Sequence, residues 1–241
     1  MLFARNRIAV FPLALAGFFS LCIALYLSRA PVLPVFSAGE RPQKPVYVVD
    51  AGHGGEDGGA LSAKGEKESD INLAIARRLD EALLFLGRET RMTRREDVSI
   101  YSDGAESLRE KKKSDLKNRV ALVNGIPGAV LVSIHQNSLP SVPSVHGAQV
   151  FYGSVPWSGE LAASVQTSLN QCVNQAHEKH EKEIDPSVYL MKHVTVPAIL
   201  VECGFLSNAA EAEMLQEPDH QKTLSIAIAA GLLRAEEGRT P

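Results

Sequence analysis

The stretch VYVVDAGHGGEDGGA (residues 46–60) begins with a short apolar run rich in β-branched residues and ends in a glycine-rich turn that carries His53. Two later runs have the same form, because AVLVSI leads to His135 and AILV leads to Glu202. Short apolar runs of this kind are typical of strands buried in a parallel sheet. The carboxyl ends of such strands meet at one edge of the sheet, where ligand sites collect. We therefore expect the two histidines and the glutamate to converge on one point.

Helical patterns separate these strands. Apolar residues recur at helical spacing from Ile71 to Leu86, with Asp70 as the expected N-cap and Gly87 as the stop. Strands are expected at residues 46–49, 129–134, 149–152 and 198–201 and around Met92. Further helices are expected from Ser114 to Asn124 and from Ser158 to Val173. Two more should follow the last strand: one after Asn208, which reads as an N-cap because Glu211 lies three residues later, and one that begins at Asp219 after Pro218. Strands that alternate with helices predict an α/β fold: a single domain with a mostly parallel twisted sheet flanked by helices.

The N-terminal part of the chain differs from the rest. Residues 8–28 carry no charge and follow Arg5 and Arg7, and this length suits a helix that crosses a bilayer. Basic residues before the run place the later residues outside the membrane, so we expect an exported protein. The run is longer than the apolar region of most signal peptides, which favours an uncleaved anchor over a cleaved signal. The expected division is a signal or membrane anchor (1–29), a proline-rich linker (30–45) and a folded domain (46–241).

Composition excludes several classes of protein. The 241 residues are 45% hydrophobic and 22% charged, which is typical of a soluble globular chain. A formal net charge of −3 is far from the basic footprint of a dedicated nucleic-acid binder, so no nucleic-acid partner is expected. Three cysteines, one of them in the apolar N-terminal run, do not form a disulfide framework. The glycine-rich turn lacks both nucleotide-binding patterns, and its two acids would repel phosphate.

The expected cluster has the composition of a catalytic zinc site. Such a site uses imidazole and carboxylate ligands and leaves one position open. The third ligand has three candidates just before the first helix, Glu66, Glu68 and Asp70, and residue type alone does not choose among them. Glu202 follows an apolar strand, where burying an unpaired carboxylate costs free energy. Its presence there indicates either a catalytic role or a buried ion pair.

Four ordered blocks of sequence resemble a known family. They are VVDAGHGGEDGGA, ESDINLAIA, VSIHQNS and PAILVECGFLSN, and they resemble the zinc-dependent N-acetylmuramoyl-L-alanine amidases of the amidase-3 family from about Val46 to Leu233. Within that family, PSVPSVHGAQVFYG, YLMKHVTVPA and the cysteine in the last block are most similar to the germination-specific amidase of endospore formers.

The resemblance implies that His53, Glu68 and His135 are zinc ligands and that Glu202 is the catalytic carboxylate. Glu66 is a minor rival to Glu68, because the family often has a lysine after the glutamate and this chain has Ser69. Zinc would activate water and polarise the substrate carbonyl, and the catalytic glutamate would act as general base and then general acid. For Asp50 the sequence leaves two roles open, which are to orient a ligand histidine or to cap the turn.

The resemblance also implies the substrate, which is the amide between the lactyl group of N-acetylmuramic acid and the L-alanine of peptidoglycan. The favoured setting is the spore cortex, where stem peptides are removed before muramic-δ-lactam forms. The protein is expected at the outer face of the cytoplasmic membrane, in the cell wall or in the forespore intermembrane space. Alternatives are a vegetative autolysin, a zinc peptidase that cuts the stem peptide, and a silent wall-binding relative. Besides peptidoglycan, the membrane is an expected partner if the N-terminal segment is uncleaved, and the sequence leaves a protein partner open.

Overall fold

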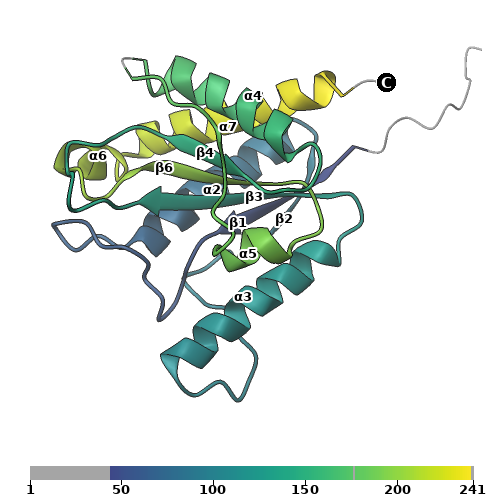
Figure 1. Cartoon of the computed structure of the whole chain (residues 1–241), viewed down its shortest axis with the longest axis vertical. Coiled ribbons are helices and arrows are strands. Elements are labelled where there is room, and N and C mark those ends of the chain that lie inside the picture. Colours follow the sequence, from purple (N-terminus) through teal and green to yellow (C-terminus); the bar gives the residue numbers. More distant parts are fainter. Residues whose placement is uncertain (1–43, 176, 240–241) are drawn as a thin grey trace, which may run out of the picture. The chain divides into compact units, whose positions relative to one another are not determined.

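The structure is a computed structural model that describes residues 44–175 and 177–239. These residues form six strands and six helices. Figure 1 shows the strands as arrows with the helices packed around them. The strands are β1 (Val46–Ala51), β2 (Glu89–Met92), β3 (Ala129–Asn137), β4 (Gln149–Tyr152), β5 (Lys182–Glu183) and β6 (Ala198–Phe205). The helices are α2 (Glu68–Phe85), α3 (Leu108–Asn124), α4 (Ser158–Cys172), α5 (Tyr189–His193), α6 (Ala209–Met214) and α7 (Pro218–Glu237).

The six strands form one sheet in the order β2-β1-β3-β6-β4-β5. The pairs β1–β2, β1–β3, β3–β6 and β4–β5 are parallel, and β4 runs antiparallel to β6. The predicted single α/β domain with a mostly parallel sheet is therefore confirmed. All five expected strands are present, and the three buried ones extend two to four residues further than predicted.

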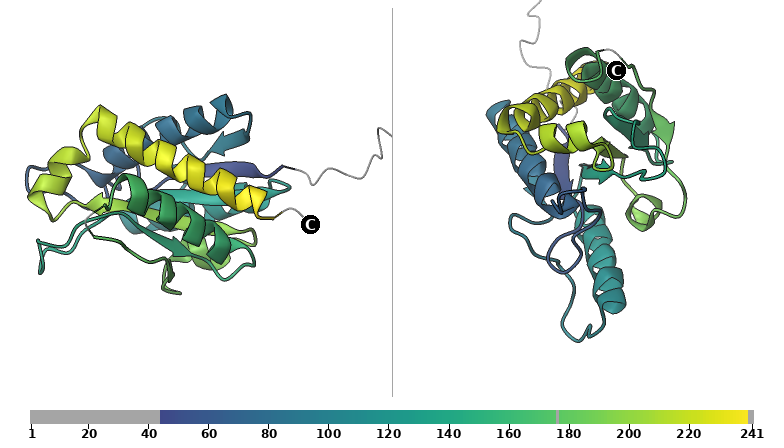
Figure 2. Two further views of the ribbon diagram at one scale, coloured as in Figure 1. Left: turned by 90° about the horizontal axis from the view of Figure 1, so that it is seen from above. Right: turned by 90° about the vertical axis from the view of Figure 1, so that its left-hand side faces the viewer.

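Helices cover both faces of the sheet. The two views of Figure 2 place α2, α4 and α7 on one face and α3 and α5 on the other. Side chains alternate along a strand, so Tyr47 and Val49 pack in the cluster with α2, α4 and α7, while Val48 packs in the cluster with α3 and α5. Both faces are apolar, which explains why the strands read as continuous hydrophobic runs.

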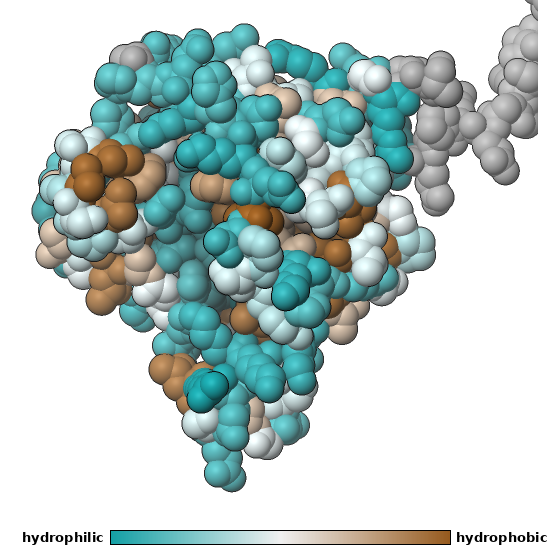
Figure 3. Space-filling model, viewed as in Figure 1, coloured by the Kyte–Doolittle hydropathy of each residue, from teal (hydrophilic) through white to brown (hydrophobic). Residues whose placement is uncertain are grey.

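Two helices begin earlier than predicted. Helix α2 starts at Glu68 after Lys67, so Asp70 lies in its first turn and is not the N-cap. Helix α3 starts at Leu108, where Ser107 and Glu110 form a capping box. The first turns of α3 are polar, and the surface over this helix is largely hydrophilic (Figure 3), so apolar periodicity gives no signal there. The predicted cap at Asn208 is confirmed, because its side chain accepts a hydrogen bond from the Glu211 N–H.

The prediction of a signal or membrane anchor falls on residues that lie outside the described part of the chain. In residues 44–175 and 177–239, no helix combines the length and the apolar character needed to cross a membrane. Cys172 is exposed and Cys203 is buried, and neither forms a disulfide.

Candidate metal centre

Three neighbouring strands end at the same edge of the sheet, and each brings one side chain to it. His53 follows β1, His135 lies near the end of β3, and Glu202 lies in β6. His135 and Glu202 are register partners on adjacent parallel strands. The rings of the two histidines meet edge to face with centroids 5.1 Å apart. The convergence expected from the strand ends is present in the structure.

The glycine-rich loop folds the start of α2 back toward His53. The Glu68 N–H donates to the Ala60 carbonyl at 2.9 Å, and the Ser69 N–H donates to the Gly58 carbonyl at 3.1 Å. Glu68 is thereby 4% exposed and faces the histidines. The rival Glu66 accepts a hydrogen bond from the Ser62 hydroxyl, and Asp70 is exposed to solvent. Of the three candidate acids, the loop brings Glu68 to the histidines.

Glu68 and the two histidines present their donor atoms to one another. Glu68 Oε1 lies 3.0 Å from His135 Nδ1 and 3.3 Å from His53 Nε2. One ligand atom from each of the three residues can be chosen so that all lie within 4.8 Å of one another. The other oxygen, Glu68 Oε2, accepts the Ala60 N–H at 2.9 Å, which fixes the orientation of the carboxylate. Two imidazoles and one carboxylate arranged in this way can hold a zinc ion and leave a position open for water.

Two buried arginines hold the backbone around His53. His53 itself has φ of 61°, a left-handed conformation that is uncommon outside glycine and asparagine. Arg119 donates to the His53 carbonyl at 2.7 Å and to the Ala51 carbonyl at 2.8 Å. Arg94 donates to the carbonyls of Ala51 and Gly52 at 2.9 and 3.0 Å. These bonds stabilise a strained backbone at the point where the histidine must be placed accurately.

The group that orients the His53 ring is Asp57. Its Oδ2 lies 3.0 Å from His53 Nδ1, and Lys112 Nζ lies 3.0 Å from the same oxygen. Metal-binding histidines commonly use such a carboxylate to fix the tautomer and the ring plane. Asp50, for which the sequence left that role open, instead accepts hydrogen bonds from Arg119, Thr93 and Ser133. It thus anchors Arg119 beneath the loop, and among the described residues no hydrogen bond joins it to a histidine.

Charge in the cluster is set by burial and by hydrogen bonds. Burial raises the pKa of Glu68, but hydrogen bonds with His135 and His53 outweigh it and hold that pKa well below its usual range. Burial lowers the pKa of His53, but the hydrogen bonds to Asp57 and Glu68 outweigh it and raise the pKa to about 9. Glu68 is therefore a carboxylate at neutral pH, and a metal ion must displace a proton from the histidine to bind there.

Glu202 has the opposite character. Its Oε2 is buried and has no hydrogen-bond partner among the described residues. Burial is the main reason why its pKa rises to about 7, and the nearby Glu68 carboxylate raises it further, against the lowering effect of the histidines. A carboxyl group with a pKa near neutrality can both accept and donate a proton at working pH. The group lines a cavity of about 250 Å³ together with His53 and His135.

Other histidines lie away from this cluster. His193, which precedes β6, is exposed, and its ring packs on Tyr189 at 4.2 Å between centroids. His146 and His177 contact each other edge to face at 4.8 Å on a separate surface. A larger hollow of about 840 Å³ between α2 and α7 contains none of the four clustered side chains. The chemistry therefore concentrates at the ends of β1, β3 and β6.

Comparison with known proteins gives consistent matches. Residues 48–234 match the family described as N-acetylmuramoyl-L-alanine amidase. The germination-specific N-acetylmuramoyl-L-alanine amidase of Bacillus subtilis is 34% identical over 198 residues, which cover 81% of this chain and 82% of that protein. The CwlD amidase of Clostridioides difficile, solved in complex with the GerS lipoprotein, has a TM-score of 0.77 and 34% identity over 81% of this chain and 100% of that chain. The catalytic domain of CwlV, an amidase of Paenibacillus polymyxa, has a TM-score of 0.68 and 27% identity over 80% of this chain and 98% of that chain.

Proposed function

Because this chain belongs to the N-acetylmuramoyl-L-alanine amidase family, we propose that it removes stem peptides from the peptidoglycan of the spore cortex, in preparation for muramic-δ-lactam formation. It is a hydrolase, and the bond it cuts is the amide between the lactyl group of N-acetylmuramic acid and L-alanine. The cortex setting rests on its similarity to the germination-specific amidase of B. subtilis. The observation that carries the chemistry is the convergence of two histidines and two glutamates at one sheet edge.

The residues His53, Glu68 and His135 would hold a zinc ion. The fit is supported by the donor set, since two imidazoles and a carboxylate are ligands that catalytic zinc uses. It is also supported by the Asp57 carboxylate on the far nitrogen of the His53 ring, a feature of metal-binding histidines. When bound, zinc supplies a Lewis acid that activates water and polarises the scissile carbonyl.

Glu202 would move the protons of the reaction. Its unpartnered Oε2 accepts a proton from the attacking water as the new C–O bond forms. The resulting carboxylic acid then donates that proton to the alanine nitrogen as the C–N bond breaks. The second proton of the water stays on the new lactyl carboxyl group, so the products are the lactyl carboxylic acid, which ionises at neutral pH, and a free amine. Burial, which raises the pKa of Glu202 in the metal-free protein, favours the acid form that the second step requires. A silent wall-binding relative would be expected to lack one of the four residues, and all four are present.

The place of action is proposed to be outside the cytoplasm. Peptidoglycan lies beyond the membrane, and the apolar run at residues 8–28 suits export or anchoring. The C. difficile relative was solved with a lipoprotein, so we propose that a protein partner also acts with this chain. Activity is therefore best assayed both for the chain alone and after addition of extract from sporulating cells of the host.

Mass spectrometry of digested peptidoglycan tests the activity. We expect wild-type chain to release stem peptides with a new L-alanine amine and to leave peptide-free muramic acid. Both products should disappear when zinc is removed with a chelator and return when it is restored. Fragments cut between amino acids would instead indicate a peptidase and would overturn the proposed reaction.

A second measurement tests the cortex setting. Deletion of the gene in its host should abolish muramic-δ-lactam in purified spore cortex while leaving vegetative muropeptides unchanged. A vegetative autolysin gives the reverse pattern, with chained cells or altered wall turnover and a normal cortex.

A further inference from the structure

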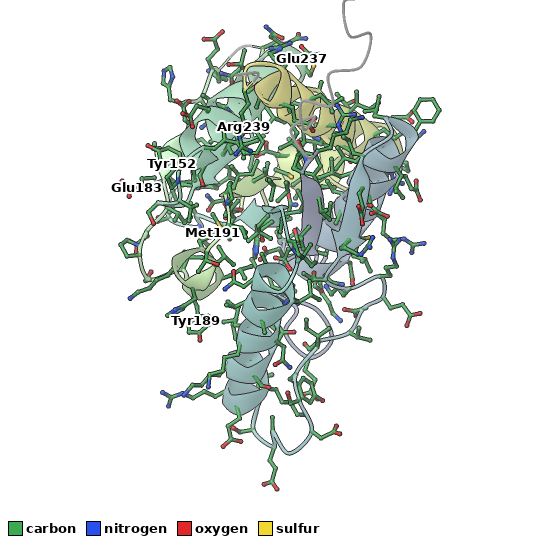
Figure 4. All side chains as sticks on the ribbon, turned by 90° about the vertical axis from the view of Figure 1, so that its right-hand side faces the viewer. Tyr152, Glu183, Tyr189, Met191, Glu237 and Arg239 are labelled. Carbon is green, nitrogen blue, oxygen red and sulfur yellow. The ribbon has the colours of Figure 1, made fainter. Side chains whose placement is uncertain are left out.

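The cavity beside Glu202 extends away from the proposed zinc ligands toward α3 and α5. Its walls there are apolar and come from Leu116, Val188, Leu190 and Leu200. Tyr189 also lines it, and Figure 4 shows this residue on α5, which packs beside α3. At about 250 Å³ the cavity is smaller than pockets for drug-sized ligands, which hold roughly 300–1,000 Å³. It can therefore take a short part of a substrate next to the reacting amide.

Four carboxylates, two histidines and two basic side chains line this cavity. The acids are Asp50, Asp57, Asp115 and Glu202, and the basic side chains are Lys112 and Arg119, which differ in how their donors are used. Arg119 is 2% exposed and bonds to Asp50, to Asp115 and to two backbone carbonyls. Lys112 lies two turns earlier on the same face of α3, and its side chain is 51% exposed. Its ammonium has three donors, and within residues 44–175 and 177–239 the ion pair that it forms is with Asp57 at 3.0 Å. Lys112 can thus bind a further anion from within the cavity.

The charge of Lys112 indicates which side of the scissile amide faces the cavity. The N-acetylated glycan is neutral around this bond, because the lactyl carboxyl is itself part of the amide. The stem peptide, in contrast, carries free carboxylates beyond its first alanine. A cation and an apolar wall therefore match the peptide side, since the wall can contact the alanine methyl and the ammonium can pair with a carboxylate.

We propose that this cavity is the binding site for the stem peptide and that Lys112 recognises a carboxylate of that peptide. The inference rests on the proposed amidase function and names the part of the substrate that determines its specificity. The ion pair with Asp57 does not prevent this role, because a half-exposed pair contributes little and the ammonium can share its donors between two carboxylates.

A competing role is that Lys112 acts only through Asp57, by steadying the carboxylate that orients His53. That role predicts a loss of zinc or of turnover that is the same for every substrate. A peptide-binding role predicts instead a loss that depends on the substrate's carboxylates. The two roles are separated by comparing substrates that differ in those groups alone.

The experiment uses the full chain in detergent and soluble peptidoglycan fragments, either native or with every carboxyl group converted to a primary amide. The variant is Lys112→Met, and the matched control is Lys113→Met, an exposed lysine of the same helix that does not line the cavity. For each protein, kcat, KM and bound zinc are measured. We expect the wild type and Lys113→Met to have a KM about fivefold lower for native than for amidated fragments, and Lys112→Met to bind both alike.

Two results would overturn the inference. One is a wild type that does not distinguish native from amidated fragments. The other is a Lys112→Met variant that keeps the wild-type preference while kcat or bound zinc falls equally for both substrates. Calorimetric binding of the two kinds of fragment to Glu202→Gln and to Glu202→Gln with Lys112→Met gives the same comparison without turnover. Absence of cleavage at the muramoyl-alanine amide would count against the proposed reaction, while this binding comparison still decides the role of Lys112.

Discussion

His135 and Glu202 are register partners on the adjacent parallel strands β3 and β6, so an imidazole and a buried carboxyl group project from neighbouring positions at the same sheet edge. The backbone ladder, and not a flexible loop, sets their relative position. Glu202 Oε2 lacks a hydrogen-bond partner among the described residues, an arrangement that stability alone does not favour. The pair is therefore best explained by a reaction that needs a proton acceptor next to the proposed metal site.

The first prediction concerns pH and the stability of the zinc-free protein. Glu202 has a folded-state pKa of about 7 against 4.5 for the free side chain. Between these values the folded state holds a proton that the unfolded state has lost, so the stabilisation present below pH 4.5 is lost as pH rises through 7. Relative to Glu202→Gln, the wild type should lose roughly 3 kcal/mol of unfolding free energy between pH 4 and pH 8. Urea unfolding of both chelated proteins measures this, and parallel pH curves would contradict it.

The second prediction concerns Gly52. A methyl group added at this position would overlap the His135 ring, whereas one added at Gly159 in α4 meets nothing within 4 Å. Gly52→Ala should therefore displace the imidazole and lower zinc affinity and activity by at least tenfold while the fold persists. Gly159→Ala serves as the control and should keep the zinc affinity and the activity of the wild type. Zinc titration with a competing chelator, together with circular dichroism, checks the prediction, and unchanged affinity in Gly52→Ala would count against it.

The third prediction concerns Asp57. Replacing it with Asn removes the charged partner of His53 Nδ1, and loss of such a group lowers metal affinity about 10- to 100-fold. The exposed Asp103 provides the matched control, so Asp103→Asn should bind zinc as the wild type does. Equal affinity in the two variants would show that Asp57 does not orient the ligand.

The fourth prediction concerns Arg119, which is buried between Asp50 and Asp115. Arg119→Met leaves these two carboxylates without their cation and removes the bonds that hold the carbonyls of the His53 loop. Breaking a buried pair in this way costs about 3–5 kcal/mol. Lys117→Met on the exposed side of α3 should change stability by about 0.5 kcal/mol or less. Thermal unfolding of the two variants measures the difference, which should vanish if the buried network contributes nothing.

The parts of the site that follow from strand ends were predictable from sequence. Apolar runs that stop at His53, His135 and Glu202 predict both the strands and their convergence, because parallel strands share one carboxyl edge. Glu68 was named through the resemblance to the amidase-3 family. The fold of the glycine-rich loop supplies the physical reason, since its backbone hydrogen bonds place Glu68 at the histidines.

Contacts made between distant segments were not predictable. The sequence around Asp57, Lys112 and Arg119 is polar and contains no motif that marks these residues. Their roles arise only when α3 packs beside the loop after β1. Strand β5 and helix α5 were also missed, because two to five residues are too few to show periodicity. The early start of α3 was missed for a related reason, although Ser107 and Glu110 have the spacing of a capping box.

The most direct test of the proposed metal centre is bound zinc measured together with amidase activity in four forms of the full chain. We expect one zinc per chain in wild type, Glu66→Gln and Glu202→Gln, and a loss of zinc in Glu68→Gln. Activity should persist in wild type and Glu66→Gln, and kcat should fall by about 10²- to 10⁴-fold in Glu202→Gln despite its zinc. Full zinc and activity in Glu68→Gln, or wild-type kcat in Glu202→Gln, would contradict the assignment of the metal centre.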